Sequence, residues 1–114
     1  MQERLTRVKP CLLVNKHVDG VPYMSVVTDL SLSGVALKTP IEPKHAPDAK
    51  VLIEIVLADA VKPMWLPAQL VRRGVHGLVV YAFEEMRIPV RRALQRFVES
   101  HQPFGEMSSA TLDG

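Results

Sequence analysis

The sequence predicts an all-β fold with one helix, in which a six-stranded antiparallel β-barrel is followed by a C-terminal α-helix. Three observations support this prediction. Short runs of β-forming residues recur along residues 8–83, turn residues separate them at regular spacing, and a helical hydrophobic period begins only after residue 88. The length of 114 residues is that of one small domain.

The six expected strands span residues 8–16, 21–29, 35–38, 51–57, 64–73 and 78–83. The first two form a hairpin, because Asp19-Gly20 between two β-like runs is a strong hairpin signal. Three prolines make residues 39–50 a loop, since proline cannot donate to a β-ladder. Two glycines bracket residues 74–77, which we expect to form the turn between the last two strands.

One amphipathic helix follows the strands. Val90, Leu94, Phe97 and Val98 recur at i, i+4, i+7 and i+8, whereas the charged residues between them point elsewhere. Pro89 suits the first turn of this helix. We therefore expect residues 1–102 to form a single domain with an N-terminal arginine-containing arm. Residues 103–114 show no apolar period and are expected to form a flexible tail.

Composition and charge narrow the class of protein. Hydrophobic residues make up 47% of the chain and charged residues 23%, which excludes an intrinsically disordered chain. The net charge is only +2, and aromatic residues are 5%, so neither feature argues for binding of DNA or RNA. The charged N-terminus lacks a secretory signal, and no apolar run approaches the roughly 18 residues that span a bilayer. We expect a cytoplasmic protein without membrane insertion.

Residues that could support catalysis or hold a metal are scattered. The four histidines form no pair with the spacing of metal ligands, and a single cysteine, Cys11, excludes cysteine-cluster zinc sites. Cys11 lies on the first expected strand, where a buried, inert thiol is expected. The chain has no nucleophile elbow, P-loop or dinucleotide-binding motif. We expect no enzymatic activity, no metal and no cofactor.

Two short segments resemble the motifs of the PilZ domain family. Asp29-x-Ser31-x-x-Gly34 directly follows the second expected strand and is similar to the family's (D/N)xSxxG turn. An arginine-containing stretch, residues 3–9, leads into the first strand, where the family has RxxxR. The order of the remaining strands and the helix agrees with the family over residues 3–100. On this order of parts the chain is identified as a member of the family.

The resemblance implies a barrel that binds the bacterial second messenger cyclic di-GMP. Arg4 and Arg7 would take the arginine positions of the ligand site, and Asp29, Ser31 and Gly34 would complete it. These side chains suit guanine, because an arginine fork can donate to N7 and O6 and a carboxylate can accept from N1–H and the exocyclic amine. The Ser31 hydroxyl would lie beside the ring. Gly34 would permit a positive φ and a close approach of the ligand.

The arginine half of the motif departs from the family pattern. Arg7 takes the second arginine position, but the residue four positions earlier is Glu3, and Arg4 lies one position late. Glu3 brings a negative charge toward a dianionic ligand, whereas the turn from Asp29 to Gly34 is intact.

Two functions therefore remain open. The first is a stand-alone effector that binds cyclic di-GMP and relays the signal by contact with an unidentified protein partner. The alternative is a degenerate adaptor that does not bind the ligand and acts only through protein partners, for example motility or pilus machinery. Either protein would be a monomer or a homodimer. The exposed arginines of the expected helix, Arg91, Arg92 and Arg96, form a basic strip that is either a solvated face or a partner-docking surface.

Overall fold

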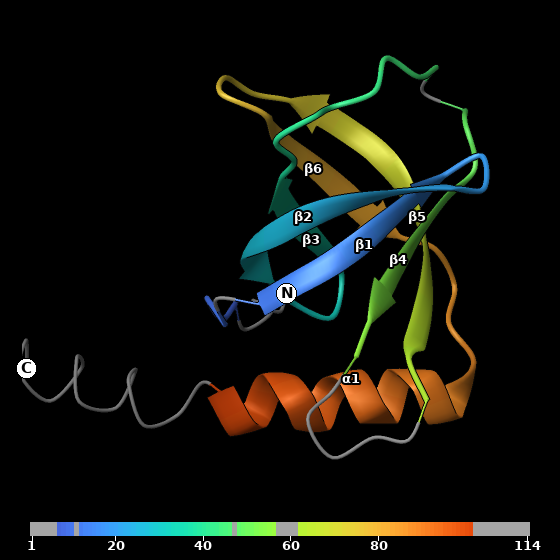
Figure 1. The fold of residues 1–114 in the computed structure, drawn as a ribbon. Coiled ribbons are helices and arrows are strands. Elements are labelled where there is room, and N and C mark those ends of the chain that lie inside the picture. Colours follow the sequence, from blue (N-terminus) through green and yellow to red (C-terminus); the bar gives the residue numbers. More distant parts are fainter. Residues whose placement is uncertain (1–6, 11, 47, 57–61, 102–114) are drawn as a thin grey trace, which may run out of the picture.

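A closed six-stranded barrel with one helix forms the structure, a computed structural model that describes residues 7–10, 12–46, 48–56 and 62–101 (Figure 1). The elements are β1 (Leu12–Val18), β2 (Val21–Leu30), β3 (Gly34–Lys38), β4 (Val51–Ile55), β5 (Met64–Arg73), β6 (Leu78–Phe83) and α1 (Ile88–His101). Around the barrel the order is β1-β2-β3-β6-β5-β4, and all neighbouring strands are antiparallel. The predicted fold class is confirmed.

The first strand begins later than the sequence predicted. β1 starts at Leu12, whereas Val8 makes only an isolated bridge to Leu30 on β2. Pro10 lies between them and has no amide hydrogen, so a continuous ladder from residue 8 is not available. The fourth strand is also shorter than expected, because β4 ends at Ile55. Cys11, residues 1–6 and residues 102–114 lie outside the described residues, and so do the expectations that rest on them.

Both predicted hairpin turns contain residues with positive φ. Asp19 and Gly20 have φ values of 50° and 88° between β1 and β2, which is the backbone of a type I′ turn. His76 and Gly77 have φ values of 58° and 77° between β5 and β6. Two successive positive φ values match the right-handed twist of paired strands, so these turns fix the register of both hairpins.

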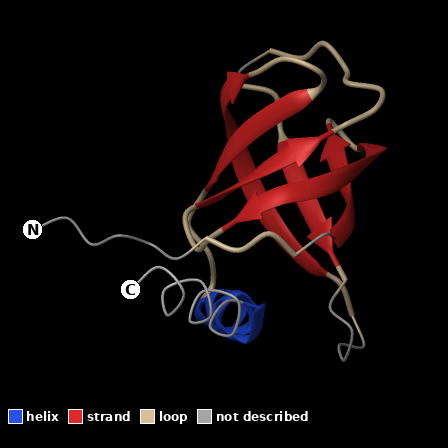
Figure 2. Ribbon diagram, turned by 90° about the vertical axis from the view of Figure 1, so that its left-hand side faces the viewer, coloured by secondary structure: helices blue, strands red, loops and turns tan. Residues whose placement is uncertain are grey.

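The hydrophobic core fills the barrel and extends under the helix. Alternate residues of the strands point inward, and the core includes the fully buried Leu37, Ile53 and Leu66. Figures 1 and 2 show α1 lying against one end of the barrel. Its Leu94 and Val98 join the core, as the helical period predicted. α1, the helix of the described region, has neither the length nor the apolar character needed to cross a membrane.

A lysine is buried inside the barrel and forms an ion pair with the loop between β3 and β4. Lys16 of β1 is fully buried, forms an ion pair with Glu42 of that loop, and lies 5.2 Å from the centre of the Tyr81 ring. Arg73 of β5 binds the same carboxylate, with 2.6 Å between Nη1 and Oε2. Burial lowers the pKa of Lys16, and the hydrogen bond that its ammonium group donates to Glu42 opposes that shift. The loop is further held by a 3.2 Å hydrogen bond between His45 and the Tyr81 hydroxyl.

The backbones of β3 and β6 approach each other closely at Gly34. Gly34 is paired with Ala82, and a Cβ at Gly34 would overlap the carbonyl oxygen of Tyr81. Gly34 does not have a positive φ, so the expectation that it supplies one is wrong. This position requires glycine because of the close strand approach and not because of its own dihedral angle.

We expect Glu42→Gln to destabilise the fold more than Lys16→Met. The first change leaves a buried ammonium group without its carboxylate, at a cost of about 3–5 kcal/mol. The second removes the buried charge with a side chain of similar length and leaves Glu42 bound to Arg73. The free energy of unfolding in urea measures both effects. A loss in Lys16→Met equal to or larger than that in Glu42→Gln would contradict this account of the network.

Gly34→Ala should lower the free energy of unfolding by about 1–3 kcal/mol, because the added methyl group meets backbone atoms that cannot move aside. Gly74→Ala is the matched control. Its added methyl group would meet the flexible side chain of Leu78 at 3.1 Å, and Gly74 also lacks a positive φ. Equal losses in the two variants, measured by denaturant unfolding, would show that strand approach is not what requires glycine at residue 34.

Candidate functional site

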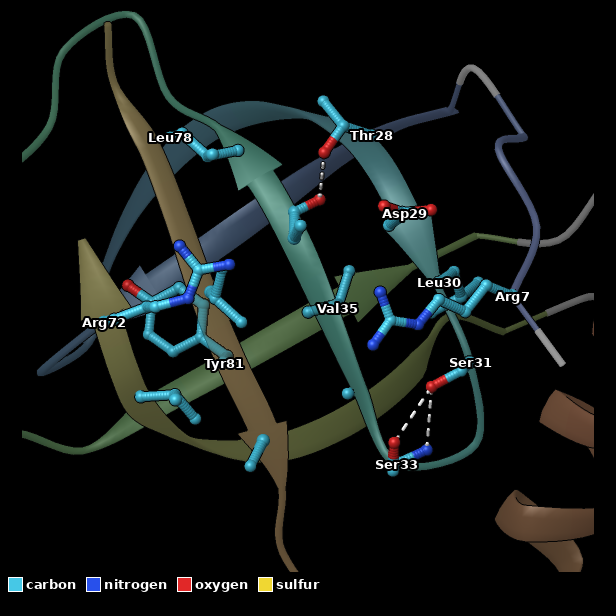
Figure 3. A pocket seen from close by; sticks show the side chains of 15 residues that line it. Arg7, Thr28, Asp29, Leu30, Ser31, Ser33, Val35, Arg72, Leu78 and Tyr81 are labelled. Carbon is cyan, nitrogen blue, oxygen red and sulfur yellow. Dashed lines mark hydrogen bonds between the residues drawn. The ribbon is translucent and has the colours of Figure 1, made fainter. Parts of the chain in front are cut away.

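An open groove lies on the outer surface of the barrel, across β2, β3, β6 and the end of β5 (Figure 3). Its volume is about 310 Å³. The charged side chains among its lining residues are Arg7, Asp29 and Arg72. Small apolar residues, Ala36, Val80 and Ala82, contribute to its floor. The groove therefore combines a shallow apolar surface with charged groups at its edges.

One row of cross-strand neighbours spans the groove. Asp29 of β2 is paired with Ala36 of β3, Ala36 with Val80 of β6, and Val80 with Arg72 of β5. Neighbouring strands are about 4.8 Å apart, so the backbones at the two ends of this row are separated by about 14 Å along the surface. The row ends in a carboxylate on β2 and a guanidinium group on β5.

A β-bulge in β2 turns Asp29 toward the groove. The register shifts between Val27 and Asp29, which makes Thr28 an extra residue in the strand. Val27 and Leu30 are both buried although they are three residues apart, whereas strict alternation would bury residues two apart. The Thr28 hydroxyl donates a 3.1 Å hydrogen bond to the carbonyl of Ala36 and so stabilises the bulge. If β2 instead alternated regularly through Thr28, Asp29 would point into the barrel.

A second β-bulge, in β5, has the same effect on Arg72. The register shifts between Leu70 and Arg72, which makes Val71 the extra residue. Arg72 therefore points outward into the groove, and Arg73 is free to turn the other way and bind Glu42. Bulges commonly redirect side chains in this manner next to functional sites. The two bulges place Asp29 and Arg72 at opposite ends of the same row.

The β2–β3 turn is built around Ser31. Its side chain is largely buried, its hydroxyl lies 3.0 Å from the Ser33 hydroxyl, and it accepts a 3.2 Å hydrogen bond from the Ser33 amide. The Ser31 amide donates to the carbonyl of Gly34 at 3.0 Å. Ser31 lines the groove, yet its hydroxyl already holds the turn together. Its contact with a ligand stays a prediction.

The segment before β1 brings Arg7 to the groove. Val8 and Leu30 exchange two backbone hydrogen bonds of 2.9 Å, which ties this segment to the end of β2. Figure 3 shows the Arg7 side chain reaching toward β3 between Asp29 and Ser31. Arg4, the other arginine of the predicted site, lies outside the described residues.

The charged groups of the groove are available to a ligand. Within the part of the chain that the structure describes, the side chains of Arg7, Asp29 and Arg72 make no hydrogen bond or ion pair. Arg73, by contrast, binds both Glu42 and the carbonyl of His45, at 2.6 and 3.3 Å. Guanidinium groups donate to anionic and carbonyl oxygens and stack on flat rings, and a carboxylate accepts from N–H groups. The groove thus suits a flat, anionic ligand with both donors and acceptors.

Sequence reasoning found most of this site and missed one residue. Arg7, Asp29, Ser31 and Gly34 all line the same groove, as the motif implied. Arg72 was not predicted, because regular alternation in residues 64–73 would place Arg72 on the inward face and Arg73 on the outward face. No group of three or more side chains suited to hold a metal ion occurs among the described residues.

Solved structures share this architecture. The PilZ domain of CeSA from a cellulose-synthesizing bacterium is 25% identical, with a TM-score of 0.68 over 82% of this chain and 95% of that chain. The PilZ domain of YcgR from Escherichia coli, solved with c-di-GMP, is 17% identical, with a TM-score of 0.62 over 96% and 98%. The Bacillus subtilis inhibitor of motility, MotI/DgrA, is 14% identical, with a TM-score of 0.71 over 90% of this chain and 52% of that chain.

Comparison with protein-family models identifies the same domain as the structural comparison. No curated protein is significantly similar to this chain in sequence. The family model of the PilZ domain, a regulatory receptor domain and not a catalytic one, matches residues 2–100. These residues include the segment that carries Arg7, the β2–β3 turn, all six strands and most of α1. The chain belongs to the PilZ domain family.

Proposed function

We propose that this protein is an effector that binds cyclic di-GMP in the outer groove and relays the signal by contact with another protein. The observation that carries the proposal is the convergence of Arg7 and Asp29, neither of them paired within the described residues, beside the turn from Ser31 to Gly34. The presence of c-di-GMP in the solved PilZ domain of YcgR supports the choice of ligand.

The chemistry of the groove fits a guanine base. The Asp29 carboxylate would accept hydrogen bonds from N1–H and the exocyclic amine, and Arg7 would donate to N7 and O6 or stack on the ring. The small side chains of Ala36 and Ala82 leave the floor open to a flat purine. The positive charge of the arginines offsets the two phosphates of the ligand.

The β2–β3 turn would carry the signal toward α1. Ser33 lines the ligand groove and also a second cavity of about 460 Å³, which includes Leu32, Phe83 and Met86 together with Arg91 of the helix. A ligand that orders this turn would thereby alter the surface between the barrel and α1. Arg92 and Arg96 are exposed on that helix, as expected, and give the partner surface a basic character.

An adaptor without ligand binding is the second candidate function. One residue, Glu3, favours it, because a carboxylate at the first arginine position of the motif would repel the ligand phosphates. The positions of Arg7 and Asp29 favour the effector, since the Val8–Leu30 bridge and the bulge in β2 bring these two side chains to one groove. Titration of the protein with cyclic di-GMP separates the two candidates directly.

Asp29→Ala should weaken cyclic di-GMP binding by roughly 10- to 150-fold, because a hydrogen bond to a charged group contributes about 1.5–3 kcal/mol. The fold should be retained, since Asp29 makes no hydrogen bond among the described residues. Isothermal titration calorimetry measures the affinity, and thermal unfolding checks the fold. Asp48→Ala is the control, because Asp48 is an exposed loop carboxylate outside the groove.

Two outcomes would contradict these assignments in different ways. No heat of binding with the unmodified protein would exclude the effector and leave the adaptor. Binding by Asp29→Ala within twofold of the unmodified protein would retain the effector but remove Asp29 from the ligand site. Equal losses in Asp29→Ala and Asp48→Ala would show that the loss does not come from a contact made by Asp29, because a change in net charge alone would strengthen binding of an anionic ligand.

A further inference from the structure

We propose that Arg72 of β5 is a ligand-binding residue of this protein and holds the end of cyclic di-GMP that lies away from Asp29. The inference rests on the proposed function and adds a contact outside the two sequence motifs. Arg72 would supply the guanidinium group that the N-terminal motif lacks, because Glu3 stands where the family motif has its first arginine. The missing guanidinium group is replaced from the opposite side of the groove.

The register of the strands fixes where Arg72 lies. The bulge at Val71 places its backbone opposite Val80, in the row that ends at Asp29. Figure 3 shows Arg7 and Arg72 on opposite sides of β3, with both guanidinium groups directed toward the strand between them. A ligand lying over Ala36 would therefore meet an arginine from each side.

The position of Arg72 is also chemically distinct from that of its neighbour. The Arg73 guanidinium group binds Glu42 and the carbonyl of His45, whereas the Arg72 side chain has no hydrogen bond or ion pair within the described residues. Its backbone is held in the β5–β6 ladder, so only the side chain must be ordered when a ligand binds. Arg72 thus combines a backbone held in the sheet with a guanidinium group that is available to a ligand.

The dimensions of the row indicate which part of the ligand Arg72 meets. The backbones of Asp29 and Arg72 are about 14 Å apart along the surface, so a base bound at Asp29 does not fill the row. Cyclic di-GMP carries two phosphates and a second guanine beyond that base. All of these present oxygen or nitrogen acceptors that a guanidinium fork binds well. Arg72 is therefore expected to serve the second half of the ligand.

The charge balance of the groove makes ligand binding depend on Arg72. Among the described lining residues, Arg7 and Arg72 are the cations and Asp29 is the anion. Loss of Arg72 would leave no net positive charge in that set to face two phosphates. Both attraction and hydrogen bonding would be lost together.

The test is calorimetric titration of the full chain with cyclic di-GMP, using Arg72→Ala, Arg72→Lys and Arg92→Ala. We expect Arg72→Ala to raise Kd by at least tenfold. Arg72→Lys keeps the charge but loses the planar fork, so its Kd should lie between those of the unmodified protein and Arg72→Ala. Arg92→Ala removes the same charge from the exposed face of α1 and should change Kd by less than twofold.

The outcomes separate this inference from the proposed function. If the unmodified protein binds and Arg72→Ala binds within twofold of Arg92→Ala, the role of Arg72 is refuted and the proposed function stands. If the unmodified protein does not bind, both fall. Retention of the thermal unfolding midpoint in Arg72→Ala, together with loss of affinity, supports a direct contact and excludes misfolding. A lower midpoint that accounts for the weaker binding would overturn it.

Discussion

Closure of the barrel is the constraint on which the rest of this structure depends. Each strand in a closed barrel has one face toward the core and one toward solvent, so residue parity decides which side chains are buried. Two strands depart from that parity, β2 at Thr28 and β5 at Val71. Both departures redirect a charged residue outward while the core remains filled, and the groove lies between them. The groove therefore forms where two strands depart from the regular alternation that the rest of the barrel follows.

The same constraint explains the buried charge. Lys16 lies at an inward position of β1, where the core would accept an apolar side chain, and it is tolerated because Glu42 meets it from the β3–β4 loop. Arg73, turned away from the groove by the bulge in β5, binds the same carboxylate. The end of β5 thus serves two purposes, with one arginine for the loop and one for the groove.

The sequence predicted the fold and most of the site because those features depend on local patterns. Asp19-Gly20 marked a hairpin, and the spacing of Leu94 and Val98 marked the buried face of α1. Burial of Lys16 could not be predicted, since its partner is 26 residues away. Arg72 was missed because a bulge shifts parity without a distinctive residue. In β2, by contrast, the three-residue interval from Val27 to Leu30 was a readable signal.

A bulge absorbs one residue of chain length without changing which face of the sheet each later residue of the strand occupies. The Val71 side chain is 57% exposed, so many residues could occupy its position. Removal of that one residue would place Arg72 directly after Leu70 and restore regular alternation, with Arg72 still opposite Val80 and Arg73 still opposite Val79. The Arg72 guanidinium group would remain in the groove, and that of Arg73 would remain at Glu42. Homologous barrels can therefore differ at this position in length as well as in composition, because a single-codon deletion there would preserve both the core and the groove.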